Sequence, residues 1–191
     1  MRKILRLAAT IGTATLALSL AGVGVYLGCL QALGNVHTVI PGELYRSATL
    51  ASERLAALVA EQGIRTVVNL RGGSADGGWL RDEVAAAEAR GAHVVTLHWA
   101  AHREVSDDEV ATFFRVIAES PKPILIHCKS GSDRTGLAVA LYLAKLKGAS
   151  ELRSEMHLSI LYGHLSVPFL SAYAMDRTFE RLEPSLGFVG S

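Results

Sequence analysis

Residues 124–147 read ILIHCKSGSDRTGLAVALYLAKLK and combine a short apolar run, a polar turn and a longer apolar run. The first run, ILIH, is typical of a buried strand. Residues 135–147 are apolar on most sides and indicate a buried helix. The stretch therefore predicts a strand, a tight loop and a helix in the core of one domain.

Further candidate strands and helices alternate along the rest of the chain. The expected strands are residues 44–47, 65–70 and 93–98, in addition to 124–127. The expected helices are residues 52–62, 79–90, 135–147, 151–161 and 168–181, together with one that follows the capping box 106–109 and ends near residue 119. Ser52 is the expected cap of the first. This alternation predicts an α/β fold with a central, mainly parallel sheet flanked by helices.

The N-terminal segment has the composition of a membrane-spanning helix. Arg2, Lys3 and Arg6 open the chain, and no Asp, Glu, Lys or Arg follows until Glu43. Residues 7–33 are almost wholly apolar, and about 20 such residues span a bilayer as a helix. The three leading cations predict a cytoplasmic N-terminus and export of the remainder.

A cleaved signal peptide is the alternative for this segment, because small residues at 17, 19 and 21 lie near a possible cleavage point. The apolar run continues well past that point, which favours an uncleaved anchor. We therefore expect residues 1–34 to form a membrane anchor or signal peptide. Residues 35–185 are then the catalytic domain, and 186–191 a tail.

Composition excludes several classes of protein. Half of the residues are hydrophobic, which excludes a disordered chain. The formal net charge is +1, with 19 basic and 18 acidic residues, so a strongly basic nucleic-acid-binding face is not expected. The two cysteines, Cys29 and Cys128, permit at most one disulfide.

The polar turn between the predicted strand and helix has the residues of an anion-binding loop. Five residues separate Cys128 from Arg134, enough for the backbone N–H groups to converge on one centre in front of the helix N-terminus. Arg134 can bind two oxygens of a tetrahedral anion. The same positive field stabilises Cys128 as a nucleophilic thiolate, and Thr135 can donate a hydrogen bond to its sulfur. The residues expected around a bound phosphate are Lys129, Ser130, Gly131, Ser132, Asp133 and Arg134.

Two other places could contribute to the same site. Arg71 follows a predicted strand at the edge of the sheet where ligands gather, and it could contact substrate or form a surface ion pair. Residues 162–164 (YGH) fit a turn between helices and could also line the pocket.

The decad HCKSGSDRTG, residues 127–136, resembles the HCxxGxxR[ST] signature of the cysteine-dependent protein tyrosine and dual-specificity phosphatase superfamily. The stretches LYRS at 44–47 and GIRTVVNLR at 63–71 are similar to the opening of its bacterial exported members. The resemblance covers roughly residues 38–180. It implies a phosphatase-like fold and a cysteinyl-phosphate intermediate on Cys128. Rhodaneses and arsenate reductases also use cysteine anion loops, but usually lack this arrangement.

The sequence departs from the family pattern at the general acid. Members usually place an aspartate in the loop after the preceding strand, and residues 99–105 (WAAHREV) contain none. Myotubularin-like phosphatases carry an aspartate beside the signature arginine, so the resemblance puts Asp133 first as the proton donor. Its alternative role is to orient loop amides or pair with a cation. The other candidates are Glu104, His102, Asp107 and Asp108, the last two also fitting a role at a helix N-terminus.

The sequence thus predicts a phosphomonoester hydrolase, in first place a protein tyrosine or dual-specificity phosphatase. The substrate is a phosphorylated protein or a small phosphomonoester. The alternatives are a phosphoinositide or inositol phosphate phosphatase, and a catalytically weak phosphate-binding module. No cofactor, metal or nucleic-acid partner is expected. The expected location is the bacterial inner membrane, with a single pass and a periplasmic catalytic domain, or the periplasm after signal cleavage.

Overall fold

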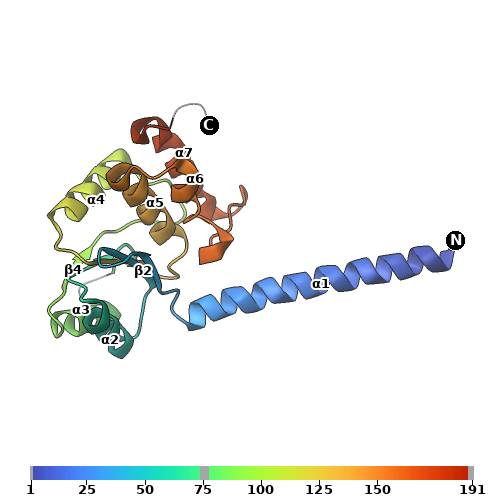
Figure 1. Cartoon of the computed structure of the whole chain (residues 1–191), viewed down its shortest axis with the longest axis horizontal. Helices are drawn as coiled ribbons and strands as arrows, with labels where there is room; N and C mark the ends of the chain where they lie inside the picture. Colours follow the sequence, from blue (N-terminus) through green and yellow to red (C-terminus); the bar gives the residue numbers. More distant parts are fainter. Residues whose placement is uncertain (1, 74–77, 189–191) are drawn as a thin grey trace. The chain divides into compact units, whose positions relative to one another are not determined.

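A computed structural model describes residues 2–73 and 78–188 of the chain (Figure 1). The chain divides into two compact units, Met1–Leu33 and Gly34–Ser191, which are described separately. Of the expected tail, residues 189–191 lie outside the described part.

The first unit is the single helix α1 (Arg2–Ala32). Within it, the 23 residues Thr10–Ala32 have a mean hydropathy of 1.7 and are long and apolar enough to cross a membrane. An N-terminal signal sequence has the same properties, so the helix is a candidate membrane span by length and composition.

The second unit is built around a five-stranded sheet with the strand order β1-β2-β5-β3-β4. β1 pairs antiparallel with β2, and the other neighbours are parallel. The expectation of a mainly parallel sheet is therefore confirmed, and β5 with Cys128 at its end lies in the middle. The strands are β1 (His37–Ile40), β2 (Leu44–Ala48), β3 (Thr66–Asn69), β4 (His93–Thr96) and β5 (Ile124–Cys128).

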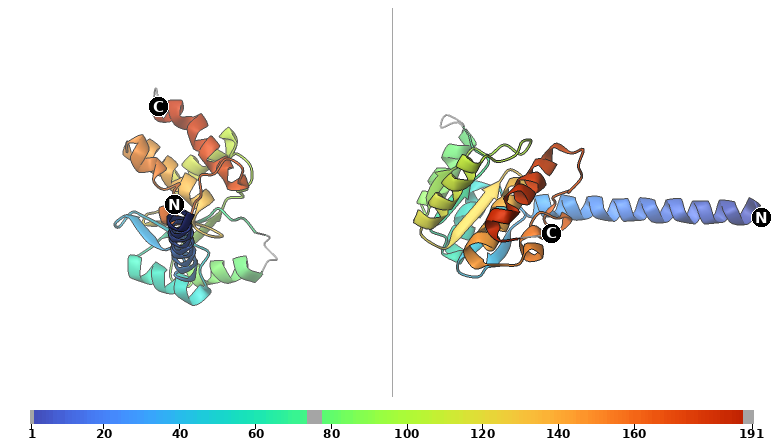
Figure 2. Two further views of the ribbon diagram at one scale, coloured as in Figure 1. Left: turned by 90° about the vertical axis from the view of Figure 1, so that its right-hand side faces the viewer. Right: turned by 90° about the horizontal axis from the view of Figure 1, so that it is seen from above.

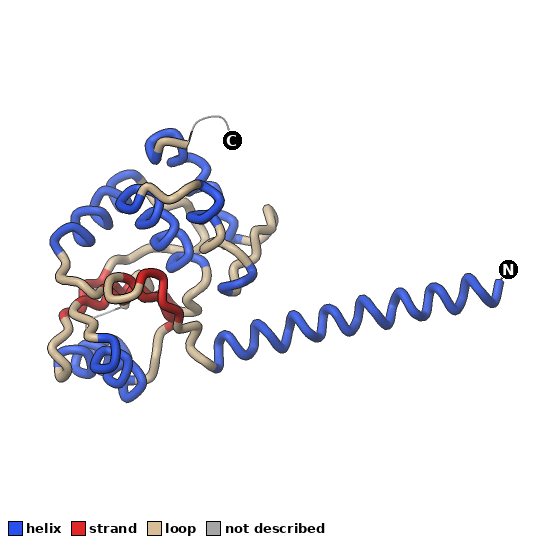
Figure 3. Tube along the Cα trace, in the orientation of Figure 1, coloured by secondary structure: helices blue, strands red, loops and turns tan. Residues whose placement is uncertain are grey.

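Helices cover both faces of this sheet (Figures 1 and 2). Side chains alternate along each strand: Ile124 and Ile126 contribute to the core on one face, and Leu125 to the core on the other. The first face packs against α4 (Asp107–Glu119), α5 (Asp133–Lys147) and α7 (Ala174–Leu186), and the second against α2 (Ser52–Gln62) and α3 (Gly78–Glu88). Between α5 and α7 the chain forms α6 (Glu151–Glu155) and two 3₁₀ turns, Ile160–Tyr162 and Ser171–Tyr173. Figure 3 shows the strands between two helical layers.

The C-terminal helices differ most from the sequence-based expectation. α6 ends at Glu155 and α7 begins at Ala174, where helices over 151–161 and 168–181 were expected. After Glu155 the chain leaves helical geometry and brings His157 against Arg46 of β2, a tertiary contact that local propensity does not encode. Two smaller differences are that Ala51, and not Ser52, is the cap of α2, and that β1 was not expected.

Candidate active site

The anion loop consists of residues 129–132, which join the end of β5 to the start of α5. At Gly131 the backbone φ is 72°, a left-handed conformation that favours glycine. A Cβ atom there would lie 2.7 Å from backbone atoms of Ser47 and Ala48. The loop therefore packs directly on the end of β2, and a side chain at position 131 does not fit.

The backbone carbonyls at the start of this loop are bonded to groups outside it. Four consecutive carbonyls accept such bonds. The hydroxyl and the amide of Thr49 donate to the carbonyls of Cys128 (3.0 Å) and Lys129 (3.3 Å), respectively. Asn35 donates to the carbonyl of Ser130 at 3.1 Å, and Arg46 donates to that of Gly131 at 2.7 Å. In a trans peptide the N–H points opposite to the preceding carbonyl. The N–H groups of residues 129–132 therefore face away from these partners, as an anion-binding loop requires.

Arg46 is a fully buried cation beneath the loop. Besides its bond to Gly131, its guanidinium donates to the backbone carbonyl of His157 at 3.2 Å and lies 3.9 Å from the ring centroid of Tyr162. Burial lowers the pKa of Arg46 to about 10, which still leaves it charged at neutral pH. Arg46 thus connects β2, the anion loop and the segment after α6.

The groups expected to carry the chemistry lie together at the start of α5. Cys128 is buried and free of any disulfide. Arg134 donates through Nη1 to the carbonyls of Trp99 (3.1 Å) and Leu70 (3.4 Å), which follow β4 and β3. Within the described part of the chain, Arg134 Nε and Thr135 Oγ1 are buried and have no hydrogen-bond partner. Unpartnered buried polar atoms are rare. Arg46 Nε and His127 Nε2 are the two others in the described residues, whereas Arg134 Nε and Thr135 Oγ1 lie at the start of α5, where an anion is expected to bind.

The signature histidine, His127, contacts a buried carboxylate that sequence analysis did not single out. Its Nε2 atom lies 3.2 Å from Glu83 Oε2 of α3, an electrostatic contact without the alignment of a hydrogen bond. The other carboxylate oxygen of Glu83 accepts a bond from Asn69 Nδ2 at 3.0 Å. Glu83 therefore ties α3 to the ends of β3 and β5. The ring of His127 therefore contacts the protein interior.

Asp133 is the first residue of α5, and its carboxylate is paired with a histidine. The Nδ1 atom of His164 lies 2.8 Å from Asp133 Oδ1, and its Nε2 atom lies 2.8 Å from Asp176 Oδ2. Burial of the ring disfavours protonation, but the hydrogen bonds to the two carboxylates outweigh it and raise the pKa of His164 to about 9. At neutral pH the ring is an imidazolium. The contact corresponds to the alternative role expected for Asp133, pairing with a cation.

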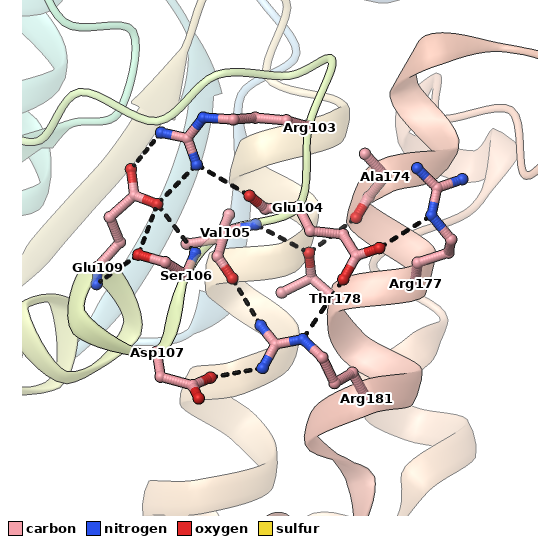
Figure 4. A network of polar contacts seen from close by, with 10 residues as sticks. All are labelled: Arg103, Glu104, Val105, Ser106, Asp107, Glu109, Ala174, Arg177, Thr178 and Arg181. Atoms are coloured by element: carbon pink, nitrogen blue, oxygen red, sulfur yellow. Dashed lines mark hydrogen bonds and ion pairs between the residues drawn. The ribbon is translucent and has the colours of Figure 1, made fainter.

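The carboxylates after β4 are paired with arginines, mostly from α7 (Figure 4). Glu104 lies 3.1 Å from Arg177 Nε and 3.4 Å from Arg181 Nε, and Asp107 pairs with Arg181 as well. The amide of Val105 donates to Thr178 Oγ1 at 3.1 Å. The capping box at the start of α4 is confirmed, since Ser106 and Glu109 bond reciprocally. The loop after β4 is therefore held against α7 over residues 104–107.

Of the remaining candidates, His102 and Lys129 are exposed and Arg71 is half-buried. His102 forms no hydrogen bond or ion pair with any residue that the structure describes. Arg71 stacks on the ring of Trp79, at 3.9 Å from its centroid. No group of three or more His, Cys, Asp or Glu side chains within residues 2–73 and 78–188 is arranged to hold a metal ion.

Sequence analysis missed Asn35 and Glu83, and it placed His164 only in a turn that could line the pocket. Each of the three contacts the anion loop or its neighbours from a segment distant in sequence. Glu83 left a usable signal, because it lies on the same helical face as Leu80 and Ala87, where an apolar residue is expected.

Comparisons with known proteins agree with this geometry. The family model described as "DSP-PTPase phosphatase fused to NAD+ Kinase" matches residues 37–166. The chain is 37% identical over 116 residues to the dual specificity protein phosphatase TpbA of Pseudomonas aeruginosa strain UCBPP-PA14. That alignment covers 60% of this chain and 48% of the relative, so the chain spans about half the length of the curated relative.

Solved structures show the same fold. The crystal structure of P. aeruginosa TpbA has a TM-score of 0.58 at 28% identity, over 80% of this chain and 91% of that chain. A cysteine-to-serine variant of TpbA in complex with pTyr gives 0.59 at 27% identity, over 81% and 91%. A DUF442 protein of Shewanella putrefaciens CN-32 gives 0.60 over 82% of this chain and 96% of that chain, and at 17% identity its likeness concerns the fold alone.

Proposed function

This chain belongs to the DSP-PTPase phosphatase family, and on that premise we propose that it hydrolyses phosphomonoesters through a cysteinyl-phosphate intermediate. One observation carries the proposal: the loop after Cys128 has its carbonyls bonded outward, while Arg134 Nε and Thr135 Oγ1 are left without partners beside it. That arrangement binds a tetrahedral dianion next to a thiolate.

In the first step, the Cys128 sulfur attacks phosphorus. An S–P bond forms as the bond from phosphorus to the leaving oxygen breaks, and a general acid gives its proton to that oxygen. The loop amides and Arg134 bind the three other oxygens, whose charge they stabilise through the transition state. Because Arg134 is already held by the carbonyls of Trp99 and Leu70, its guanidinium needs little reorientation when the substrate arrives.

In the second step, water attacks the phosphorus of the cysteinyl-phosphate. An O–P bond forms, the S–P bond breaks, and the thiolate is restored with release of inorganic phosphate. Thr135 is placed to donate a hydrogen bond to the leaving sulfur, since its hydroxyl is buried at the start of α5 without another partner. The group that gave its proton to the leaving oxygen now accepts one from water.

For that group, the contacts favour His102 over the carboxylates. Asp133 contacts the ring of His164, and Glu104 and Asp107 contact arginines, so each carboxylate already has a cationic partner. His102 has no such partner, lies between Trp99 and the residues held by α7, and has the side chain most often used as general acid.

The substrate class proposed is a phosphorylated protein, with phosphotyrosine first. The support is the 37% identity to a dual specificity protein phosphatase and the likeness to its complex with pTyr. The proposed setting is the bacterial inner membrane, with α1 as a single-pass anchor and the catalytic domain in the periplasm. The apolar span Thr10–Ala32 and the cations that precede it support this location.

Substitution of the nucleophile tests the proposal. The full chain should turn over an aryl phosphate and a phosphotyrosine peptide, and Cys128→Ser should abolish both reactions. The variant should still bind inorganic phosphate, because backbone amides and Arg134 make most of the site. Residual turnover within about tenfold of the wild type would contradict a thiolate mechanism, since loss of a covalent nucleophile removes several orders of magnitude in rate.

A further inference from the structure

Asp133, His164 and Asp176 form a row of ion pairs beside the anion loop. The His164 ring is fully buried, and each of its nitrogens lies 2.8 Å from a carboxylate oxygen. A ring with both nitrogens facing acceptors donates from both, so it carries a positive charge. The three residues come from the start of α5, the loop that follows Ile160–Tyr162, and the first turn of α7.

The position of Asp133 is unfavourable for phosphate binding when taken alone. It lies in the first turn of α5, next to Arg134, at the helix end whose positive field draws the anion. Ser132 at the cap makes no side-chain bond to that turn, so the field is left for a ligand. A carboxylate at this end has the same sign as the substrate and disfavours its binding. Some feature must therefore compensate the charge of Asp133.

We propose that His164 is a positioning residue whose imidazolium compensates the negative charge of Asp133 and thereby maintains the phosphate affinity of the anion loop. Asp176 holds the ring from the other side and keeps it protonated. The inference rests on the proposed function, because it concerns how the same loop binds its substrate. The proposed role of His164 also accounts for the inward turn of the segment after α6, because that turn brings the buried His164 ring to the start of α5.

The test measures the binding of inorganic phosphate to the full chain in detergent by calorimetry, with Cys128→Ser as the parent protein. In that background His164→Gln keeps a hydrogen-bonding side chain of similar length and removes the charge. We expect phosphate affinity to fall about tenfold, the scale of one unscreened charge at the edge of a binding site. Glu180→Gln removes an exposed charge from α7 and is the matched control, expected to leave affinity unchanged.

A double substitution separates charge compensation from a structural role. Asp133→Asn together with His164→Gln removes both charges and should restore the affinity of the parent to within about threefold, since no net charge beside the loop has changed. An equal loss in the single His164→Gln and the double variant would overturn the proposal, as would full affinity in the single variant.

Two further outcomes complete the test. If His164→Gln does not fold, Asp133→Asn alone decides, because it leaves an uncompensated imidazolium and should tighten phosphate binding; weaker binding would overturn the proposal. If the parent protein binds no phosphate at all, the proposed function fails. Phosphate binding that these substitutions leave unchanged contradicts only the role of His164.

Discussion

Arg134 connects the start of α5 to the two loops that follow β3 and β4. Its Nη1 atom bonds to carbonyls that follow β3 and β4, and the second of these belongs to Trp99, three residues before His102. The loop after β4 is thus attached to Arg134 at one end and to α7 at the other. His102 lies between the two attachments, which restricts where its imidazole can go.

If His102 donates the proton, its removal should affect esters according to the basicity of the leaving group. His102→Ala should lower kcat for an alkyl phosphate by about 10²–10⁴, the usual value of general acid catalysis. The aryl ester should change little, because a nitrophenolate leaves without a proton. In the pH–rate profile, the fall in rate at alkaline pH (the alkaline limb) reports loss of the proton from the general acid, and this fall should also disappear.

Asp133→Asn and Glu104→Gln are the controls for this prediction. The amide that replaces the Asp133 carboxylate keeps an oxygen that accepts from His164, and neither variant should remove the alkaline limb. Equal losses for alkyl and aryl esters in His102→Ala would show that the residue only shapes the loop. Loss of the limb in Glu104→Gln or Asp133→Asn would identify that carboxylate as the donor.

Among single residues, the sequence predicted those site residues that lie close to one another along the chain. Cys128, Arg134 and Thr135 are placed together by one strand–loop–helix unit, so their spacing was sufficient to propose them. Asn35, Glu83 and His164 reach the same region through the fold. Nothing local assigns them a role there, except that Glu83 interrupts an apolar helical face.

The ion pairs of His164 with Asp133 of α5 and Asp176 of α7 make the stability of the fold depend on pH. The pKa of His164 is raised from 6.5 in an unfolded chain to about 9, through the carboxylates of Asp133 and Asp176. The stabilisation is therefore fully present below pH 6.5 and is lost as pH rises through 9. A pKa raised this far corresponds to about 3 kcal/mol of folding free energy.

Urea unfolding at pH 7 and at pH 10 checks this expectation. The free energy of unfolding should fall between the two pH values by an amount that His164→Gln largely removes. His157 is the internal contrast: burial, followed by the charge of Arg46, lowers its pKa to about 3, so its effect is a loss of stability as pH falls below 6.5. A His164→Gln variant that keeps the wild-type alkaline slope would contradict the assignment.

Two element boundaries followed local signals in the sequence, although the expectation of a cap at Ser52 was wrong. α4 has its capping box, and α2 ends at Gly63 in a left-handed conformation, as the glycine indicated. α6 and α7 depart from expectation because residues 157 and 164 are drawn into the interior by Arg46 and by two carboxylates. Tertiary contacts outweigh helix propensity there.

For the whole molecule, the proposed location makes a prediction about the N-terminus. The mature chain should keep Arg2, Lys3 and Arg6, remain with the membrane fraction after a high-salt wash, and be digested by protease added to spheroplasts. N-terminal sequencing and protease accessibility measure this. A mature N-terminus near residues 20–22 would indicate a cleaved signal, and protection from protease would place the domain in the cytoplasm.

The mainly parallel sheet could be predicted from the alternation of strand-like and helix-like segments along the chain. Parallel strands that are buried on both faces are short, apolar and separated by helices. β1 was missed: it is an edge strand of four residues with partly exposed side chains, and it pairs with β2 through a tight turn. Its pattern lacks the buried run that identified the others.

The strand order β1-β2-β5-β3-β4 has a consequence for synthesis. β2 and β3 leave the ribosome before β5, yet they are neighbours of β5 and not of each other. A nascent chain that ends before residue 124 thus lacks the strand that joins the two halves of its sheet. Such distant pairings form late, after their loops have closed. The burial of Cys128 at the end of β5 is therefore completed only when the sheet closes around that strand.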